Sequence, residues 1–268
     1  MTSTSPWLNN PVGILLQRND KESTDLYVGS DLICLIPYAE SIVWFVLGFL
    51  SIDCGTSAAS NYTNPSNTIQ WAPDTVIWPE IGSWSATANV SLPTSLTDQT
   101  QYGTLRYFPT NRALNQSKFC YTLPALAGNY YLIRASFWLG QKLLYPTRVS
   151  GQITFRVIVD SYEGVEIVIN VPQSNPWFEE MYIPAQSGRS SVSVCLSTAS
   201  NSSDAPFINS LELRPLPSTM KPVEMMKNTN YALRTVWRED SGALSAVPPI
   251  LRWVLSNSYL KSYMSLSS

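Results

Sequence analysis

The chain has 268 residues, of which 44% are hydrophobic, 12% aromatic and only 13% charged, and its formal net charge is -2. Such a chain can bury a core, but it lacks the run of like charges that nucleic-acid binding needs. The sequence contains no histidine, which excludes Ser-His-Asp and Cys-His catalysis and every zinc site that uses histidine. It also lacks a phosphate-binding glycine loop of the G-x-x-x-x-G-K-[ST] or G-x-G-x-x-G type, so we expect no nucleotide chemistry, no cofactor and no metal.

The first 31 residues are mixed and polar, and they lack the basic-then-apolar layout of a signal peptide. Residues 32–50 then read LICLIPYAESIVWFVLGFL, about the length of a membrane-spanning segment, with Pro37 and Glu40 near the middle. A carboxylate there costs about 2.5 to 3.5 kcal/mol on insertion scales. We therefore interpret residues 1–47 as an atypical N-terminal segment, whose apolar part is the remnant of a leader. Association with a membrane through residues 32–50 stays open.

Beyond residue 50 the hydrophobic residues recur at a period of two, which is typical of half-buried antiparallel strands. Five apolar faces follow this period. They are Tyr131, Ile133, Ala135 and Phe137; Ile153, Phe155, Val157 and Val159; Val165, Ile167, Ile169 and Val171; Val192, Val194 and Leu196; and Phe207, Leu211 and Leu213. Turn signals separate them, and no helical period intervenes. We expect an all-β fold, an antiparallel jelly-roll-like β-sandwich over about residues 48–217, with poorly ordered ends at residues 1–31 and 241–268.

Four cysteines stand too far apart for a zinc knuckle or a C-x-x-C redox pair: Cys34, Cys54, Cys120 and Cys195. The last three are disulfide candidates. In the predicted register Cys195 points away from the apolar face of its strand, so it faces a second layer or meets another cysteine. A bridge from Cys120 to Cys195 would contribute about 2 to 4 kcal/mol, and two free buried thiols are the alternative.

Four N-glycosylation sequons lie in stretches rich in Ser, Asn and Pro, which we interpret as surface loops. They begin at Asn61, Asn89, Asn115 and Asn201. Together with the few charged residues, they favour a protein of the secretory pathway, located at the plasma membrane or outside the cell.

Residues 48–55, GFLSIDCG, resemble the opening strand of plant malectin-like domains, in which an Ile-Asp-Cys-Gly element begins the fold. Further landmarks follow in the order of that family. They are YFP at 107–109, CYTL at 120–123, YLIRASF at 131–137, VCL at 194–196 and PFINSLELRPL at 206–216. The resemblance implies that residues 48–217 are the first of the two sandwich modules in the ectodomain of a leucine-rich-repeat receptor-like kinase.

The resemblance weakens towards the C-terminus. Residues 231–238, YALRTVWR, resemble the lead into the second module, but the expected arginine-tyrosine-proline-aspartate segment does not follow. We therefore expect residues 218–268 to hold the start of a truncated second module and an unrelated tail. No kinase motif is present, and whether the chain is a natural truncation or a gene-model fragment stays open.

The family's namesake binds a glucose disaccharide through aromatic and acidic loop residues, so the resemblance implies an extracellular, carbohydrate-binding-like module. Sugar rings stack their C–H faces on indole and phenol rings. Six aromatic residues lie at predicted strand ends or in loops: Trp78, Trp84, Tyr102, Tyr107, Trp138 and Tyr145. Trp138 and Tyr145 lead this set, because strand alternation predicts that Trp138 is an exposed indole just beyond the face that ends at Phe137. The alternative is that these rings cover the core.

Acidic residues give little support for an enzyme. Glu163, Glu166, Glu179 and Glu180 could include a glycosidase pair, but adjacent Glu179 and Glu180 would point to opposite sides of a strand. We expect Asp53 of the Ile-Asp-Cys-Gly element to be a structural hydrogen-bond acceptor. The predicted partner is a cell-wall glycan. The alternatives are a receptor ectodomain that binds a cell-surface protein or peptide without affinity for sugar, and an inactive fragment.

Overall fold

The computed structural model describes residues 14–18, 24–28, 31–33, 49–65, 68–93, 99–109, 118–140, 151–162, 164–200, 202–227, 231–240 and 260–267. The chain divides into two units, Met1–Leu47 and Gly48–Ser268. The first unit holds an antiparallel sheet of β1 (Ile14–Arg18), β2 (Thr24–Val28) and β3 (Asp31–Ile33). These strands lie largely within the N-terminal end, residues 1–31, for which poor order stays a prediction.

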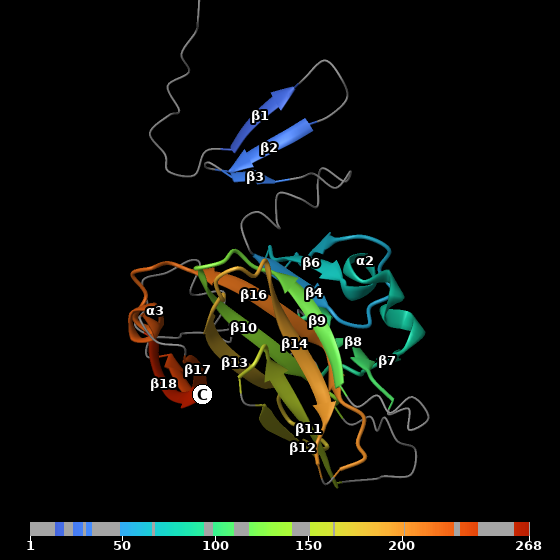
Figure 1. Cartoon of the computed structure of the whole chain (residues 1–268). Helices are drawn as coiled ribbons and strands as arrows, with labels where there is room; N and C mark the ends of the chain where they lie inside the picture. Colours follow the sequence, from blue (N-terminus) through green and yellow to red (C-terminus); the bar gives the residue numbers. More distant parts are fainter. Residues whose placement is uncertain are drawn as a thin grey trace, which may run out of the picture. The chain divides into compact units, whose positions relative to one another are not determined.

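The second unit is built on two sheets that face each other, the smaller in front of the larger in Figure 1. The larger sheet has the order β18 (Leu260–Ser267), β17 (Ala232–Asp240), β13 (Trp177–Pro184), β10 (Tyr130–Phe137), β16 (Ser210–Leu216), β4 (Leu50–Asp53), β6 (Gln70–Pro73) and β5 (Tyr62–Thr63). The smaller has the order β12 (Val165–Val171), β11 (Gly151–Val159), β14 (Ser191–Thr198) and β9 (Lys118–Pro124). Every pairing is antiparallel except β4 with β6. The predicted all-β sandwich is confirmed.

The core lies between the two sheets because each central strand turns alternate apolar side chains inwards. In β11 the buried residues are the predicted Ile153, Phe155, Val157 and Val159, and the residues between them are only half-buried. Three phenylalanines join the layers. The ring of Phe155 lies 5.3 Å from that of Phe137 and 5.4 Å from that of Phe207, in edge-on and tilted arrangements that aromatic rings prefer.

A third sheet of β15 (Phe207–Ile208), β8 (Thr104–Tyr107) and β7 (Ala86–Asn89) lies beside the sandwich. Short helices accompany it: α2 (Asp74–Ile77) and two 3₁₀ turns, η1 (Pro79–Ser83) and η3 (Thr100–Tyr102).

Arg106 of β8 binds Asp74 of α2 through two hydrogen bonds, and both side chains are almost fully buried. Asp74 also accepts a hydrogen bond from the amide of Gly55 at 3.1 Å. A side chain at Gly55 would collide with β8, because its Cβ would lie 2.4 Å from the carbonyl oxygen of Leu105. The glycine of the Ile-Asp-Cys-Gly element is therefore needed for close packing.

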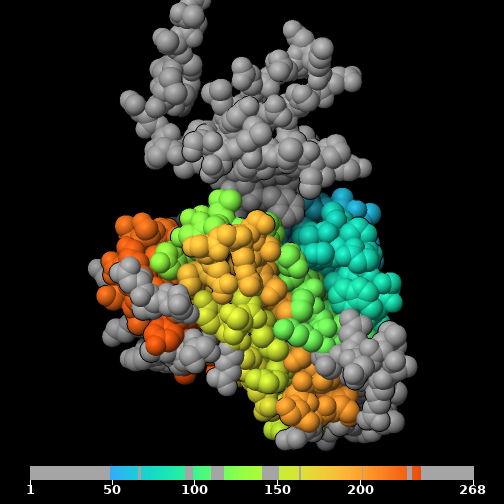
Figure 2. Space-filling model, in the orientation of Figure 1, coloured from blue at the N-terminus to red at the C-terminus, as the bar shows by residue number. Residues whose placement is uncertain are grey.

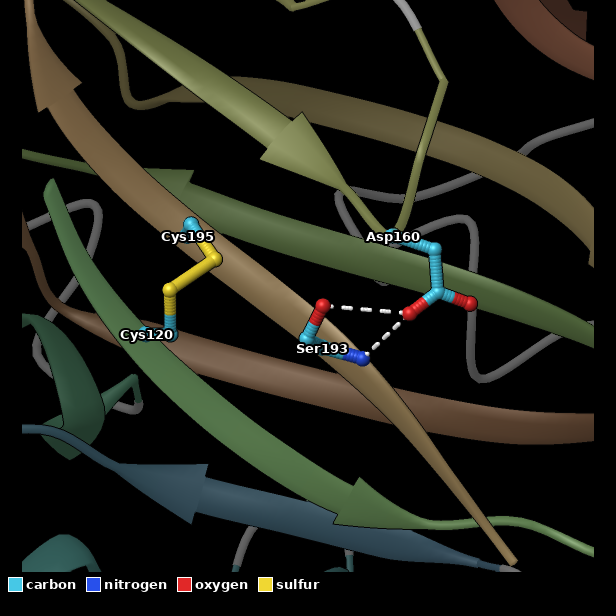
Figure 3. The surroundings of a disulfide bond; sticks show 4 residues. All are labelled: Cys120, Asp160, Ser193 and Cys195. Atoms are coloured by element: carbon cyan, nitrogen blue, oxygen red, sulfur yellow. Dashed lines mark hydrogen bonds between the residues drawn. A yellow bond between two sulfur atoms is a disulfide. The ribbon is translucent and has the colours of Figure 1, made fainter. Parts of the chain in front are cut away.

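A disulfide joins Cys120 and Cys195, which face each other across β9 and β14 with an S–S distance of 2.11 Å (Figure 3). It lies on the outer side of the smaller sheet, since the neighbouring residues Phe119 and Val194 point into the core. Beside it, Asp160 accepts hydrogen bonds from the backbone amide and the hydroxyl group of Ser193, at 2.7 and 3.1 Å. In the space-filling view, β9, β14 and β11 lie side by side and form one face of the sandwich (Figure 2).

The large sheet continues beyond residue 217. After α3 (Lys221–Met226), β17 pairs with β13 at Met181 and Tyr182. Met226 and Leu233 are buried in a small cluster against Leu132 and Tyr182 on the outer side of this sheet. α3 and the start of β17 therefore pack as part of the sandwich. β17 also pairs with β18.

None of the helices in the described part of the chain is long and apolar enough to cross a membrane. Most of the apolar stretch at residues 32–50, together with Cys34, lies outside that part.

Candidate ligand-binding site

A cavity of about 800 Å³ opens where three segments leave their strands. The segments are Asn89–Pro93 after β7, Trp138 and Gly140 after β10, and Gln173 and Ser174 after β12. The loops of a sandwich gather at its ends, where a rigid scaffold can hold them in place. Loops of this kind commonly provide binding sites, so this cavity is the leading candidate.

Trp138 lies in the wall of the cavity, but the prediction of an exposed indole is wrong, because only 3% of the residue is accessible. Strand alternation ends at Phe137. Beyond it the backbone amide of Trp138 donates to the side-chain oxygen of Asn209 at 2.6 Å, in place of a strand partner. This contact turns the indole into the core cluster. Its Nε1–H has no hydrogen-bond partner among the described residues.

Gln173 fixes the opposite wall. Its side-chain oxygen accepts from the amide of Leu139 at 2.6 Å, and its side-chain nitrogen donates to the carbonyl of Phe137 at 3.1 Å. Its backbone amide donates to the carbonyl of Gly140 at 3.0 Å. One side chain thus satisfies the backbone groups that the end of β10 leaves unpaired, and it couples the β10 and β12 loops. No local pattern in the sequence indicates this role.

Gly140 sets how closely the walls approach. Its φ of +62° lies in the left-handed region that suits glycine. A Cβ here would lie 3.3 Å from the carbonyl oxygen of Ser91 and 3.4 Å from both the Trp138 ring and Val90 Cγ1. The wall segments therefore meet at this residue, and any side chain would press on all of them.

The described lining residues carry no ionisable side chain. They offer one indole, two amides, two hydroxyl groups, and the apolar surface of Val90, Leu92 and Pro93. Such a lining can hydrogen-bond a neutral polar ligand and contact its apolar parts, but it provides neither a nucleophile activated by a base nor a pair of acids. Within the described residues no group of carboxylates and cysteines is arranged to hold a metal ion.

Four of the other predicted aromatic residues lie in the described part of the chain, and they do not line the cavity. Trp78 packs edge-on against Tyr121, and Trp84 stacks on Phe108 and Phe119. Tyr102 is buried beside Phe178, with ring centroids 6.3 Å apart. Tyr107 is half-buried against the core. Tyr145 lies outside the described residues. Among the described members of this set, Trp138 alone lines the cavity.

Two of the four acidic residues that the sequence raised as catalytic candidates form structural ion pairs. Glu179 binds Arg234 at 2.5 Å, while Glu180 lies 3.5 Å from Arg134. Burial raises the pKa of Glu179, and the bond to Arg234 opposes that shift. Glu166 is exposed on β12. Glu163 lies outside the described residues.

Asp53 is a buried hydrogen-bond acceptor, as the sequence indicated. It accepts from the hydroxyl of Tyr62 at 2.5 Å and from that of Thr104 at 3.4 Å. Burial raises its pKa to about 7, and the hydrogen bond from Tyr62 opposes the shift. Cys54, which follows it, is a buried free thiol whose pKa burial also raises.

Two exposed aromatic residues are not among those predicted from the sequence. Trp177 and Phe178 begin β13, three residues after the cavity residue Ser174, and are 44% and 37% exposed. The guanidinium of Arg134 lies 4.0 Å from the centroid of the Phe178 ring. A Pro-Trp-Phe run directly after a turn was the available signal.

Comparison with known proteins gives the family. The profile of the malectin-like domain matches residues 52–249, about three quarters of the chain. The chain belongs to the malectin-like domain family. The malectin-like chain is 31% identical over 221 residues to the probable LRR receptor-like serine/threonine-protein kinase At1g67720 of Arabidopsis thaliana, a match that covers 79% of the chain and 21% of that protein. It is 30% identical to the uncharacterized protein At1g24485 of the same plant, over 71% of the chain and 34% of that protein.

Solved malectin-like structures share the fold. The ANX1 ectodomain from Arabidopsis thaliana superposes with a TM-score of 0.51 at 16% identity, over 73% of the chain and 50% of that structure. The plant receptor-like kinase ANX2 gives 0.53 at 15% identity, over 73% and 50%. The chain thus spans about a fifth to a third of the curated relatives given above and about half of these ectodomain structures. What matches in the structures is the ectodomain.

Proposed function

We propose that this chain is a non-catalytic recognition module of the plant cell surface or wall, and that the cavity beside Trp138 receives a neutral, polar ligand, with a cell-wall glycan as the first candidate. The observation that carries the proposal is the lining of the cavity, in which the described residues provide an indole, amides and hydroxyl groups and no charged side chain. Sugars match this lining because they are uncharged, rich in hydroxyl groups and apolar on their C–H faces.

The low exposure of Trp138 limits what stacking contributes. A ligand can reach only a small part of the indole, so hydrogen bonds to the amides and hydroxyl groups of the lining carry more of the binding free energy. Few contacts of this kind give a dissociation constant of about 1 mM, which corresponds to about -4 kcal/mol. The module would gain useful affinity from repeated units in a polymer.

The test is a titration of the ¹⁵N-labelled chain with gluco-oligosaccharides and cell-wall glycan fragments, observed at the indole N–H signals. Trp138→Phe identifies the signal of Trp138. We expect that signal to shift saturably, because the indole lies in the cavity wall and a bound ligand would change its surroundings. Gln173→Ala should weaken the response by about tenfold or more, since it removes the wall and frees the loop backbone.

Gln152→Ala is the matched control, because Gln152 is an exposed glutamine of β11 outside the cavity, and it should bind like the wild type. If the chain unfolds cooperatively on heating but no sugar shifts the Trp138 signal, the glycan reading is wrong. If it shows no cooperative unfolding, the chain is an inactive fragment.

A second function, recognition of a cell-surface protein or peptide, is favoured by the exposed Trp177 and Phe178. Large aromatic side chains are enriched in protein interfaces, where they act as anchors. Binding of the labelled module to plant cells pretreated with protease or with glucan hydrolases separates the two functions. Loss of binding after protease and in Trp177→Ala, with no effect of Gln173→Ala, would support protein recognition.

A further inference from the structure

The two sequons within the described residues have different surroundings. The amide oxygen of Asn61 is buried. Asn89 is exposed, and it ends β7, the edge strand of the sheet with the order β15-β8-β7. A bulky glycan can project from an exposed side chain at a sheet edge without displacing packed residues, so Asn89 is the better site for one.

All three residues of this sequon, Asn89, Val90 and Ser91, line the candidate cavity. Their closeness to the indole is fixed by Gly140, where Val90 Cγ1, Ser91 O and Trp138 Cζ2 all lie within 3.4 Å of the position that a Cβ would take. A sugar attached to Asn89 would begin at the rim of the cavity, next to the segment that packs on Trp138.

We infer that Asn89 carries an N-linked glycan whose first N-acetylglucosamine covers the cavity and regulates access to it. This inference rests on the proposed function, since the cavity that the glycan covers is the proposed ligand site. The modification needs a lipid-pyrophosphate-linked oligosaccharide as donor. The Asn89 side-chain nitrogen forms a bond to C1 of the sugar and loses a proton, while the bond from C1 to the pyrophosphate oxygen breaks.

The core of the glycan has the chemistry that the cavity suits. N-acetylglucosamine is uncharged and carries hydroxyl and acetamido groups, which can pair with the amides and hydroxyl groups of the lining. A short tether gives an effective concentration on the order of millimolar. Against an external sugar of similar intrinsic affinity, the tethered sugar would weaken apparent binding by about twofold to tenfold.

The first measurement is occupancy. The full chain is secreted from cells that make only high-mannose glycans, and each sequon is then read by mass spectrometry after enzymatic deglycosylation in H₂¹⁸O. We expect isotope-labelled aspartate at position 89. An unmodified Asn89 in the secreted protein overturns the inference, whatever the state of the other sequons.

The second measurement is carbene footprinting of the folded protein, which reports on access without any ligand. Pro93 and Ser174 are exposed lining residues, and Glu166 on β12 is the reference. An endoglycosidase that leaves one N-acetylglucosamine should keep labelling of Pro93 and Ser174 low, whereas complete removal should raise it. Equal labelling of the two forms, relative to Glu166, overturns the role of the first sugar.

The last measurement compares binding of gluco-oligosaccharides to the wild type, Asn89→Gln and Asn61→Gln. Asn89→Gln should bind about twofold to tenfold more tightly. Asn61→Gln should behave as the wild type, because its sequon does not line the cavity. If footprinting changes as expected but no variant binds any sugar, the result supports a glycan that covers the cavity and contradicts the proposed function. If sugar binds equally to the wild type and Asn89→Gln, the regulation is refuted and the proposed function stands.

Discussion

At the scale of single residues, the chain places a carboxyl group where its charge is costly. Asp53 is 2% exposed, and its neighbours within hydrogen-bond distance are hydroxyl groups of Tyr62 and Thr104. Burial raises its pKa from 3.8 to about 7, the bond from Tyr62 opposes this, and the charge of Asp74 adds to it. The folded protein therefore favours the protonated acid more than the unfolded chain does.

This difference predicts a pH dependence of stability. A raised pKa in the folded state means that the contribution is fully present below about pH 4 and is lost as the pH rises to about 7. The loss is at most about 4 kcal/mol. In thermal melts, Asp53→Asn should show a shallower fall of Tm between pH 4 and pH 8 than the wild type. Parallel curves for the two proteins would contradict the assignment.

Gly140 allows a second test at a single residue. In Gly140→Ala the new methyl group meets Ser91, Val90 and Trp138, and the backbone keeps a φ of +62° that alanine disfavours. We expect a loss of about 1 to 2 kcal/mol of stability and a weaker response of the Trp138 indole to ligand. Gly188→Ala is the control, since Gly188 has a similar φ of +79° but no atoms within 4 Å of its Cβ position. It should lose stability without any effect on binding.

At the scale of elements, the link between β8 and α2 is a buried ion pair. Arg106 and Asp74 are 2% and 0% exposed, and Arg106 also donates to the hydroxyl of Ser85 at 2.9 Å. An ion pair of this kind contributes little net stability compared with a well-packed apolar pair, but removing one partner leaves the other charge buried.

Arg106→Met should therefore lower the free energy of unfolding by about 3 to 5 kcal/mol. Unfolding in denaturant measures this change in the free energy of unfolding. Lys221→Met is the matched control, because Lys221 pairs with Glu224 at 3.5 Å on the exposed side of α3 and its loss should cost less than about 1 kcal/mol. If both substitutions lower the free energy of unfolding by a similar amount, burial of the Arg106–Asp74 pair does not make its loss more costly.

The elements also show what the sequence could predict. Strands β11, β12 and β14 were found because one buried face gives a period of two. The same period of two gives a wrong prediction at Trp138. There the side chains of Asn209 and Gln173 accept the backbone hydrogen bonds that a neighbouring strand would otherwise accept, and consecutive residues after β10 are buried. Such contacts join residues 34 to 71 positions apart, so no local pattern reveals them. The cavity escaped prediction for the same reason, although one of its residues was named.

At the scale of the whole molecule, the sandwich depends on chain beyond residue 217. Leu132 and Tyr182 are covered by Met226 of α3 and Leu233 of β17, and Arg234 neutralises Glu179. Removal of α3 and β17 would expose the edge of β13 and two apolar side chains.

A chain of residues 48–217 should therefore be less stable than one of residues 48–240 by about 3 kcal/mol or more, and more prone to aggregate through the free strand edge. Thermal melts and light scattering of both chains measure this. Equal stability would show that residues 221–234 add nothing to the fold.

The Cys120–Cys195 disulfide also limits how far the molecule can extend when force is applied to its ends. The 75 residues of sequence separation between the two cysteines cannot unravel while the bridge is intact. In single-molecule stretching, the fully extended chain should therefore be shorter by about 25 to 27 nm than after reduction. β10, β11, β12 and β13 lie within that closed loop, so these four strands carry no load along the chain once the rest of the sandwich has been pulled apart.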